Sequence, residues 1–188
     1  MAVYHDTVPP VEIIEVPTPR AYIDRSNETL VEWGTPDDLY ENYNRVFGPF
    51  TLDPAANCGR HMTIHNVLPI PSNGTLKRFF CLGCGDDGLE LPWYGRVFLN
   101  PPYDKTLSQW VQKAIDEIAT GNVDLVAMLL PVRTGRLWWG NLEFVTSATG
   151  KIIYLRKGVG GASSGRLKFK GADNSAPFDS CVALLWNL

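Results

Sequence analysis

The residues with the most specific chemistry in this chain are Asn100, Pro101, Pro102 and Tyr103, which follow an apolar run at 96–99. The run predicts a short buried strand, and the two prolines end it because neither can donate a backbone hydrogen bond. The tetrapeptide is then expected at the carboxyl end of a strand, where open α/β sheets bind ligands. Its amide oxygen and a rigid carbonyl suit an exocyclic NH2 group on a base taken out of its stack, with the tyrosine ring against that base. The alternative is an ordinary strand-ending turn with a packed tyrosine.

The tetrapeptide resembles the catalytic motif of the amino-methyltransferases, which methylate adenine N6 or cytosine N4 with S-adenosylmethionine. Three further blocks are similar, in the same order, to the small phage DNA N6-adenine methyltransferase family. They are Trp33–Pro36 (WGTP), Phe50–Ala56 (FTLDPAA), and Gly165–Phe169 (GRLKF) leading into Asn174–Ser180 (NSAPFDS). Four blocks in one order are much harder to obtain by chance than one tetrapeptide.

The resemblance implies an α/β fold: a Rossmann-like S-adenosylmethionine-dependent methyltransferase sheet with helices on both faces. It implies methyl transfer to adenine N6 in double-stranded DNA, with Asn100, Pro101, Pro102 and Tyr103 as the catalytic residues. Cytosine N4 methylation is one alternative, because the tetrapeptide suits either amine. A catalytically inactive DNA- or cofactor-binding module is the other, because the glycine pattern after Asp53 departs from the usual glycine-rich motif.

Cofactor-binding positions follow from the same resemblance. The block at 33–36 helps hold the methionine end of the cofactor in the family. Asp53 is the best single candidate, because it follows a predicted strand and small residues after it let a ligand approach the backbone. An acid in a glycine turn upstream of the catalytic strand is expected to contact the cofactor's adenine. The expected cofactor-binding residues are Trp33, Thr35, Pro36, Asp53, Pro54, Ala55, Asp87 and Asn100.

Two Cys-x-x-Cys/His pairs lie in the segment least similar to the family, at about 57–92. Their spacing is typical of a tetrahedral structural zinc site, in which His65 is an alternative to His61. The other interpretation is reduced thiols packed in a core, and disulfides are not expected in a reducing compartment. The expected zinc ligands are Cys58, His61, Cys81 and Cys84.

The charge of the chain is distributed unevenly around a net value of −3. Residues 133–188 hold eight Lys or Arg against three Asp or Glu, a surplus of five positive charges, which leaves a surplus of eight negative charges on the rest. A basic third on an acidic protein predicts a surface that faces phosphates, with a solvated face as the alternative. The glycine- and serine-rich segment at 156–176 is interpreted as a flexible flap that orders on DNA. The expected DNA contacts are Arg133, Arg166, Lys168 and Lys170.

The remaining pattern predicts one methyltransferase domain over 31–188, with the Cys/His segment as an insertion and a flexible arm at 1–30. Strands are expected at 50–53, 96–99, 123–130, 151–155 and 180–186, and helices from a Thr35 cap, over 107–119 and from 137. No apolar run is long enough to span a membrane, and the N-terminus does not resemble a signal peptide. The protein is therefore expected in the cytoplasm, which is the host cytoplasm if a phage encodes it.

Overall fold

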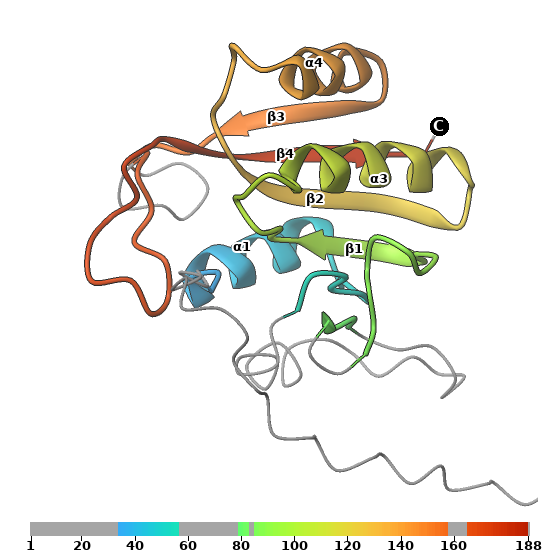
Figure 1. The fold of residues 1–188 in the computed structure, drawn as a ribbon, viewed down its shortest axis with the longest axis horizontal. Helices are drawn as coiled ribbons and strands as arrows, with labels where there is room; N and C mark the ends of the chain where they lie inside the picture. Colours follow the sequence, from blue (N-terminus) through green and yellow to red (C-terminus); the bar gives the residue numbers. More distant parts are fainter. Residues whose placement is uncertain (1–33, 57–78, 83–84, 158–164, 188) are drawn as a thin grey trace, which may run out of the picture.

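The structure, a computed structural model, describes residues 34–56, 79–82, 85–157 and 165–187. These residues form a mixed α/β arrangement with three helices and a four-stranded open sheet (Figure 1). The helices are α1 (Asp37–Phe47), α3 (Leu107–Ala119) and α4 (Leu137–Thr149). The strands are β1 (Gly95–Leu99), β2 (Val123–Pro131), β3 (Gly150–Tyr154) and β4 (Ser180–Trp186). The arrangement is compatible with a Rossmann-like fold.

The sheet has the order β1-β2-β4-β3, with β1 parallel to β2 and β4 antiparallel to both of its neighbours. Beyond β1, the sheet continues through a parallel bridge between Leu52 and Val97, and then through one between Asp53 and Phe79. All of these segments except β4 therefore run in the same direction. Their carboxyl ends share one edge of the sheet, and β4 begins at that same edge.

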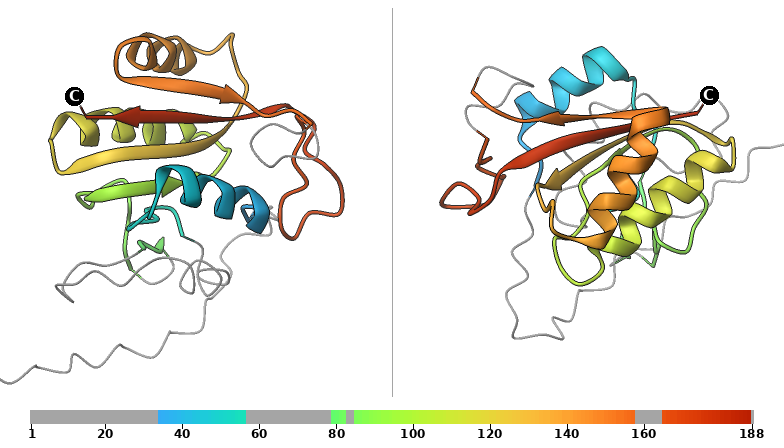
Figure 2. Two further views of the ribbon diagram at one scale, coloured as in Figure 1. Left: turned by 180° about the vertical axis from the view of Figure 1, so that it is seen from behind. Right: turned by 90° about the horizontal axis from the view of Figure 1, so that it is seen from above.

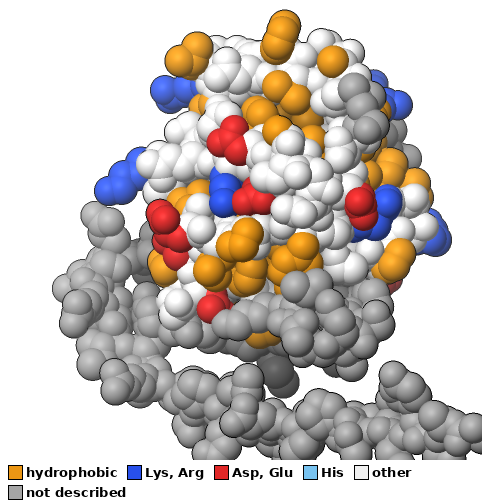
Figure 3. Space-filling model, turned by 90° about the vertical axis from the view of Figure 1, so that its right-hand side faces the viewer, with side chains coloured by type: hydrophobic (Ala, Val, Ile, Leu, Met, Phe, Trp, Pro, Cys, Tyr) orange, Lys and Arg blue, Asp and Glu red, His pale blue; other side chains and the backbone are white. Residues whose placement is uncertain are grey.

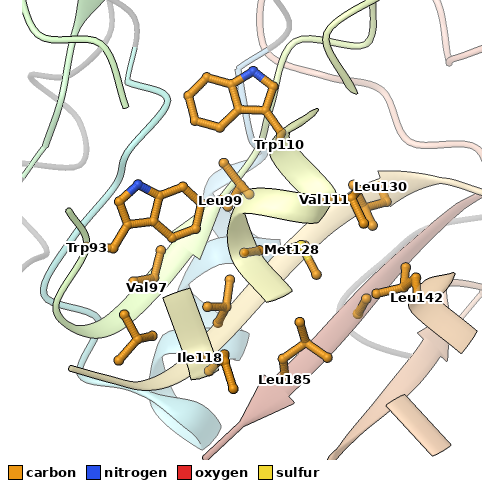
Figure 4. Packing of buried hydrophobic residues seen from close by; sticks show 14 of the residues in the cluster. Trp93, Val97, Leu99, Trp110, Val111, Ile118, Met128, Leu130, Leu142 and Leu185 are labelled. Atoms are coloured by element: carbon orange, nitrogen blue, oxygen red, sulfur yellow. The ribbon is translucent and has the colours of Figure 1, made fainter. Parts of the chain in front are cut away.

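Alternate residues of the central strand β2 face two separate cores. Val126, Met128 and Leu130 pack with α3 and α4, whereas Leu125 and Ala127 pack with α1. Figure 2 shows α3 and α4 on one side of the sheet and α1 on the other, and Figure 4 shows the first core from close by. A strand that is buried on both faces has an almost continuous apolar sequence, which is why the position of β2 could be predicted. The predicted helices on both faces are confirmed for this part of the chain.

The start of α1 differs from the prediction. Thr35 does not cap the helix: Pro36 occupies the N-cap position without a side-chain hydrogen bond, and its carbonyl accepts from Tyr40 N at 3.1 Å. Gly34 pairs with the backbone of Lys170, which keeps the chain extended up to the helix. The capping prediction was wrong because the pairing of Gly34 with Lys170, which is distant in sequence, fixes the direction in which the chain enters α1.

Other expectations fall outside the part of the chain that the structure describes. They are the arm at 1–30 and most of the Cys/His insertion. In the described part, no helix combines the length and the apolar character that crossing a membrane requires.

Candidate active site

Asp53 and Asn100 lie at the carboxyl ends of two neighbouring parallel segments. The Leu52–Val97 bridge and a hydrogen bond from Phe98 N to Leu52 O at 3.0 Å hold these segments side by side. From Asp53 the chain continues to Phe79, which pairs with Asp53 on the side away from β1. From β1 the chain continues through α3 to β2, which pairs with β1 on the side away from Asp53. Adjacent strands whose connections lead in opposite directions form the switch point where open α/β sheets bind ligands.

The Asp53 side chain is almost fully buried at this edge, with 6% of its surface exposed. Burial raises the pKa of its carboxyl group from an ordinary value of 3.8 to about 7, although a hydrogen bond from Ala55 N to Oδ1 at 3.1 Å acts in the opposite direction. An acid with this pKa can change its charge near neutral pH when a ligand brings it a hydrogen-bond donor.

The turn at Asp87–Gly88 lies directly against the segment that follows Asp53. A Cβ atom on Gly88 would approach the carbonyl oxygen of Pro54 to 1.9 Å, so only glycine fits at this position. The Asp87 carboxylate accepts a hydrogen bond from Leu89 N at 2.9 Å, and Gly88 O accepts one from Trp93 Nε1 at 2.7 Å. The fold thus brings together two predicted cofactor segments that are more than thirty residues apart in the chain.

Sequence analysis did not assign a role to Gly88 or Trp93. The stacked indole rings of Trp93 and Trp110, with centroids 6.3 Å apart, fix this turn from the side of the first core (Figure 4). The glycine beside Asp87 was the only signal in the sequence, and it did not reveal which backbone approaches it.

Tyr103 is held in place by a hydrogen bond and two aromatic contacts. Its hydroxyl donates to the carbonyl oxygen of Leu129 on β2 at 3.0 Å. The rings of Phe169 and Phe178 meet it at steep angles of 81° and 69°, with centroid distances of 5.8 and 5.7 Å. Burial raises the pKa of Tyr103 well above its ordinary value, so the hydroxyl stays protonated. Within the same tetrapeptide, Pro101 is buried and Pro102 is exposed.

The block with Thr35 and Pro36 reaches the same edge through the segment before β4. Gly34 N donates to Lys170 O at 3.2 Å, and Lys170 N donates to Gly34 O at 2.7 Å. Thr35 and Pro36 are half-buried immediately after this pairing. Because Phe169 touches Tyr103, the N-terminal block and the tetrapeptide are connected through one dipeptide. Trp33 lies outside the described residues.

Comparison with known proteins identifies the family. A family model described as DNA N-6-adenine-methyltransferase (Dam) matches residues 25–185. The chain belongs to this family. Comparison with curated protein sequences gave no match. Membership of the Dam family implies DNA adenine methylation in general, with DNA as the substrate, and the match spans all of the site segments described above.

The basic residues expected to contact DNA lie in segments that leave the site edge of this Dam-family sheet. Arg133 follows β2, and its guanidinium carbon lies 5.1 Å from the centroid of the Phe178 ring. Arg166 and Lys168 are exposed, and Arg166 Nε lies 3.9 Å from a carboxylate oxygen of Asp179. At the opposite edge, Figure 3 shows basic and acidic side chains interspersed. The DNA contacts stay predictions.

The predicted flap is partly an anchored segment in the structure. Leu167 and Phe169 are buried in the α1-side core, whereas Arg166 and Lys168 alternate with them and are exposed. Ala176 N donates to Leu167 O at 2.8 Å, which closes the segment on itself. The packing of Leu167 and Phe169 differs from the flexible flap that was expected here, and ordering of this segment on DNA stays a prediction. Residues 158–164 lie outside the described part.

The zinc prediction for this Dam-family chain finds no support in the described residues. These contain no group of three or more His, Cys, Asp or Glu side chains that could hold a metal ion. Cys58, His61 and Cys84 lie outside them. Cys81 is buried and disulfide-bonded, whereas no disulfide was expected.

Proposed function

We propose that this chain transfers a methyl group from S-adenosylmethionine to the exocyclic N6 of adenine in double-stranded DNA, on a Rossmann-like methyltransferase sheet. Family membership supports DNA adenine methylation in general. The use of S-adenosylmethionine and transfer to N6 are proposed from one observation. The Asn100–Tyr103 tetrapeptide lies beside Asp53 at the switch point of the sheet. This position would offer an acceptor pair for an amine next to the segments expected to hold a cofactor.

The residues around Asp53 fit S-adenosylmethionine. The buried carboxyl group is an acceptor for an ammonium or hydroxyl group, and the close contact between Gly88 and Pro54 brings the two expected cofactor segments together. Asp53, Pro54, Ala55 and Asp87 would hold the cofactor together with the 33–36 block. When bound, S-adenosylmethionine supplies a methyl group on a positively charged sulfur.

Asn100 and Pro101 would act on the amine of the target base. The Asn100 side-chain oxygen and the Pro101 carbonyl accept hydrogen bonds from the adenine NH2. N6 would form its bond to the methyl carbon as the bond from that carbon to the sulfur breaks, which leaves the sulfur as a neutral thioether. N6 would then be tetrahedral and positively charged, and these two acceptors would stabilise that charge before a proton passes to solvent. The protein thereby favours the transition state over the planar ground state of the amine.

Tyr103 would orient the base. Adenine must leave the DNA stack to reach the tetrapeptide, and an aromatic ring of fixed orientation would recover part of the lost stacking energy. The hydrogen bond to Leu129 O and the contacts with Phe169 and Phe178 fix the Tyr103 ring in the protein. Less ordering is then needed when the base arrives.

A labelled-methyl assay tests this proposal. Double-stranded DNA is incubated with the protein and S-adenosylmethionine carrying a labelled methyl group, and the DNA is then digested to nucleosides. We expect the label in N6-methyladenine. Label in N4-methylcytosine would establish the cytosine alternative, and no transfer by protein that binds both DNA and cofactor would establish the inactive binding module.

A further inference from the structure

Phe169 and Lys170 are consecutive residues that contact two parts of the chain far from them in sequence. Phe169 is buried, with 2% of its surface exposed, and its ring meets the Tyr103 ring edge-on at 5.8 Å. The backbone of Lys170 forms a two-way antiparallel bridge with Gly34, with hydrogen bonds of 3.2 and 2.7 Å. The dipeptide therefore touches the catalytic tetrapeptide on one side and the start of the 34–36 segment on the other.

The side chain of Lys170 adds a second connection to the same N-terminal segment. Its ammonium group forms an ion pair with a carboxylate oxygen of Asp37, in the first turn of α1. The side chains are 32% and 59% exposed, so the lysine is the more buried partner. The backbone bridge and the ion pair enclose Thr35 and Pro36 between Gly34 and Asp37. A phosphate group would have to compete with Asp37 for this ammonium group.

Lys168 differs from Lys170 although it is only two residues away. Side chains alternate along this extended segment, so Leu167 and Phe169 point into the core and Lys168 points outward. Lys168 is exposed and forms no ion pair with any described residue. The two lysines carry the same charge, but only Lys168 has an ammonium group without a carboxylate partner in this part of the chain.

We infer that Lys170 is a positioning residue for the cofactor site and that Lys168 is the lysine of this segment that faces DNA phosphate. Lys170 holds the Thr35–Pro36 segment against Phe169, and Phe169 in turn holds Tyr103. The inference rests on the proposed function, because that proposal assigns Thr35 and Pro36 to the cofactor. It changes the role of Lys170, which sequence analysis placed among the DNA contacts.

Matched variants separate the two roles. Lys170→Met and Lys168→Met remove the same charge and keep a long unbranched side chain. Two quantities are measured for each: the dissociation constant of S-adenosylmethionine without DNA, and the slope of log affinity for duplex DNA against log salt concentration. We expect Lys170→Met to weaken cofactor binding about two- to fivefold, as for a partly exposed ion pair, with an unchanged salt slope. Lys168→Met should reduce the magnitude of the salt slope by about 0.9 and leave cofactor affinity unchanged.

A charge exchange tests whether Lys170 acts through Asp37. Lys170→Asp and Asp37→Lys each place like charges together, so each should weaken cofactor binding, and the double variant should restore part of it. Full restoration is not expected, because a lysine at the N-terminus of α1 opposes the helix dipole. No restoration in a double variant with a wild-type melting temperature would overturn the role of the ion pair, as would a reduced salt slope with unchanged cofactor affinity in Lys170→Met.

Hydrogen exchange distinguishes failure of this inference from failure of the proposed function. The amides of Gly34 and Lys170 donate the two bridge hydrogen bonds, so their exchange reports directly on the connection. We expect faster exchange of both amides in Lys170→Met than in Lys168→Met. If the wild-type protein binds no S-adenosylmethionine, the proposed function fails. The exchange rates still report whether the Lys170 side chain stabilises the bridge between Gly34 and Lys170. Equal exchange in the two variants would overturn the positioning role of Lys170.

Discussion

The hydroxyl of Tyr103 donates a hydrogen bond to the main-chain carbonyl oxygen of Leu129, 3.0 Å away. This bond connects the Asn100–Tyr103 tetrapeptide after β1 to the C-terminal part of β2, the central strand of the sheet. The orientation of the ring is therefore set by the most buried strand of the protein and not by the loop alone. The hydroxyl has a positioning role, in addition to any role of the ring face.

Replacing Tyr103 with phenylalanine should separate these two roles. Tyr103→Phe removes one hydrogen bond and leaves Leu129 O without this donor, so we expect the free energy of unfolding to fall by about 1 kcal/mol. Methyl transfer should fall only a few-fold, at most about fivefold, because the aromatic face is kept. Denaturant unfolding and single-turnover kinetics measure the two effects. Tyr103→Ala should reduce transfer much further, and equal transfer rates in the two variants would contradict a role for the ring face.

The close contact of Gly88 with Pro54 gives a second prediction. Gly88→Ala places a methyl group against a backbone carbonyl that cannot move without shifting the Asp53 segment. We expect a loss of about 1–3 kcal/mol in stability and weaker binding of S-adenosylmethionine.

Gly140 on α4 is the matched control for Gly88, because a Cβ atom there meets nothing within 4 Å. Gly140→Ala should raise stability by about 0.5–1 kcal/mol, since alanine favours a helix interior, and should leave cofactor binding unchanged. Thermal unfolding and calorimetric titration check both variants. A Gly88→Ala protein with wild-type stability and cofactor affinity would show that this contact does not shape the site.

The raised pKa of Asp53 predicts a pH dependence of stability. Burial raises this pKa from 3.8 to about 7, so the folded protein favours the protonated carboxyl group. The stabilising contribution is fully present below about pH 4 and is lost as the pH rises through about 7. We therefore expect the free energy of unfolding of the wild type to fall over this range relative to Asp53→Asn, which lacks the group. A constant difference between the two proteins from pH 4 to pH 8 would contradict the raised pKa.

Cofactor binding should change with pH in the opposite sense. An ionised Asp53 is the better acceptor for an ammonium or hydroxyl group, so affinity for S-adenosylmethionine should rise between about pH 6 and pH 8 in the wild type. Asp53→Asn should bind more weakly and show a smaller pH dependence over this range. Titration calorimetry at several pH values measures both. Parallel pH profiles for the two proteins would mean that Asp53 does not contact the cofactor.

The elements predicted from hydrophobic periodicity were close to those in the structure. The helix expected at 107–119 has the bounds of α3, and the strand expected at 180–186 has those of β4. Both signals are local, because a helical stripe or a continuous apolar run is fixed by burial of neighbouring residues. In place of the strand expected at 50–53, the structure has isolated bridges at Leu52 and Asp53. The length of a strand depends on the partner beside it, and that partner is distant in sequence.

The site was predicted only in part, because most of its contacts join residues distant in sequence. The tetrapeptide and Asp53 could be found from their positions after apolar strands. The carbonyl of Leu129 carries no side-chain signal, and neither of the rings that contact Tyr103 is near it in the chain. The ion pair of Lys170 with Asp37 was missed for the same reason: a count of charges shows where lysines gather but not which of them have partners.

The transfer rate of Asn100→Ala tests the central claim, that the acceptors of the tetrapeptide carry the chemistry. Single-turnover methyl transfer to duplex DNA is measured with saturating S-adenosylmethionine, beside Asn141→Ala as a control at an exposed asparagine on α4. We expect Asn100→Ala to lose a factor on the order of a hundred or more in rate, with cofactor affinity and melting temperature largely kept, and Asn141→Ala to react at the wild-type rate. A near-wild-type rate in Asn100→Ala would contradict the proposed mechanism.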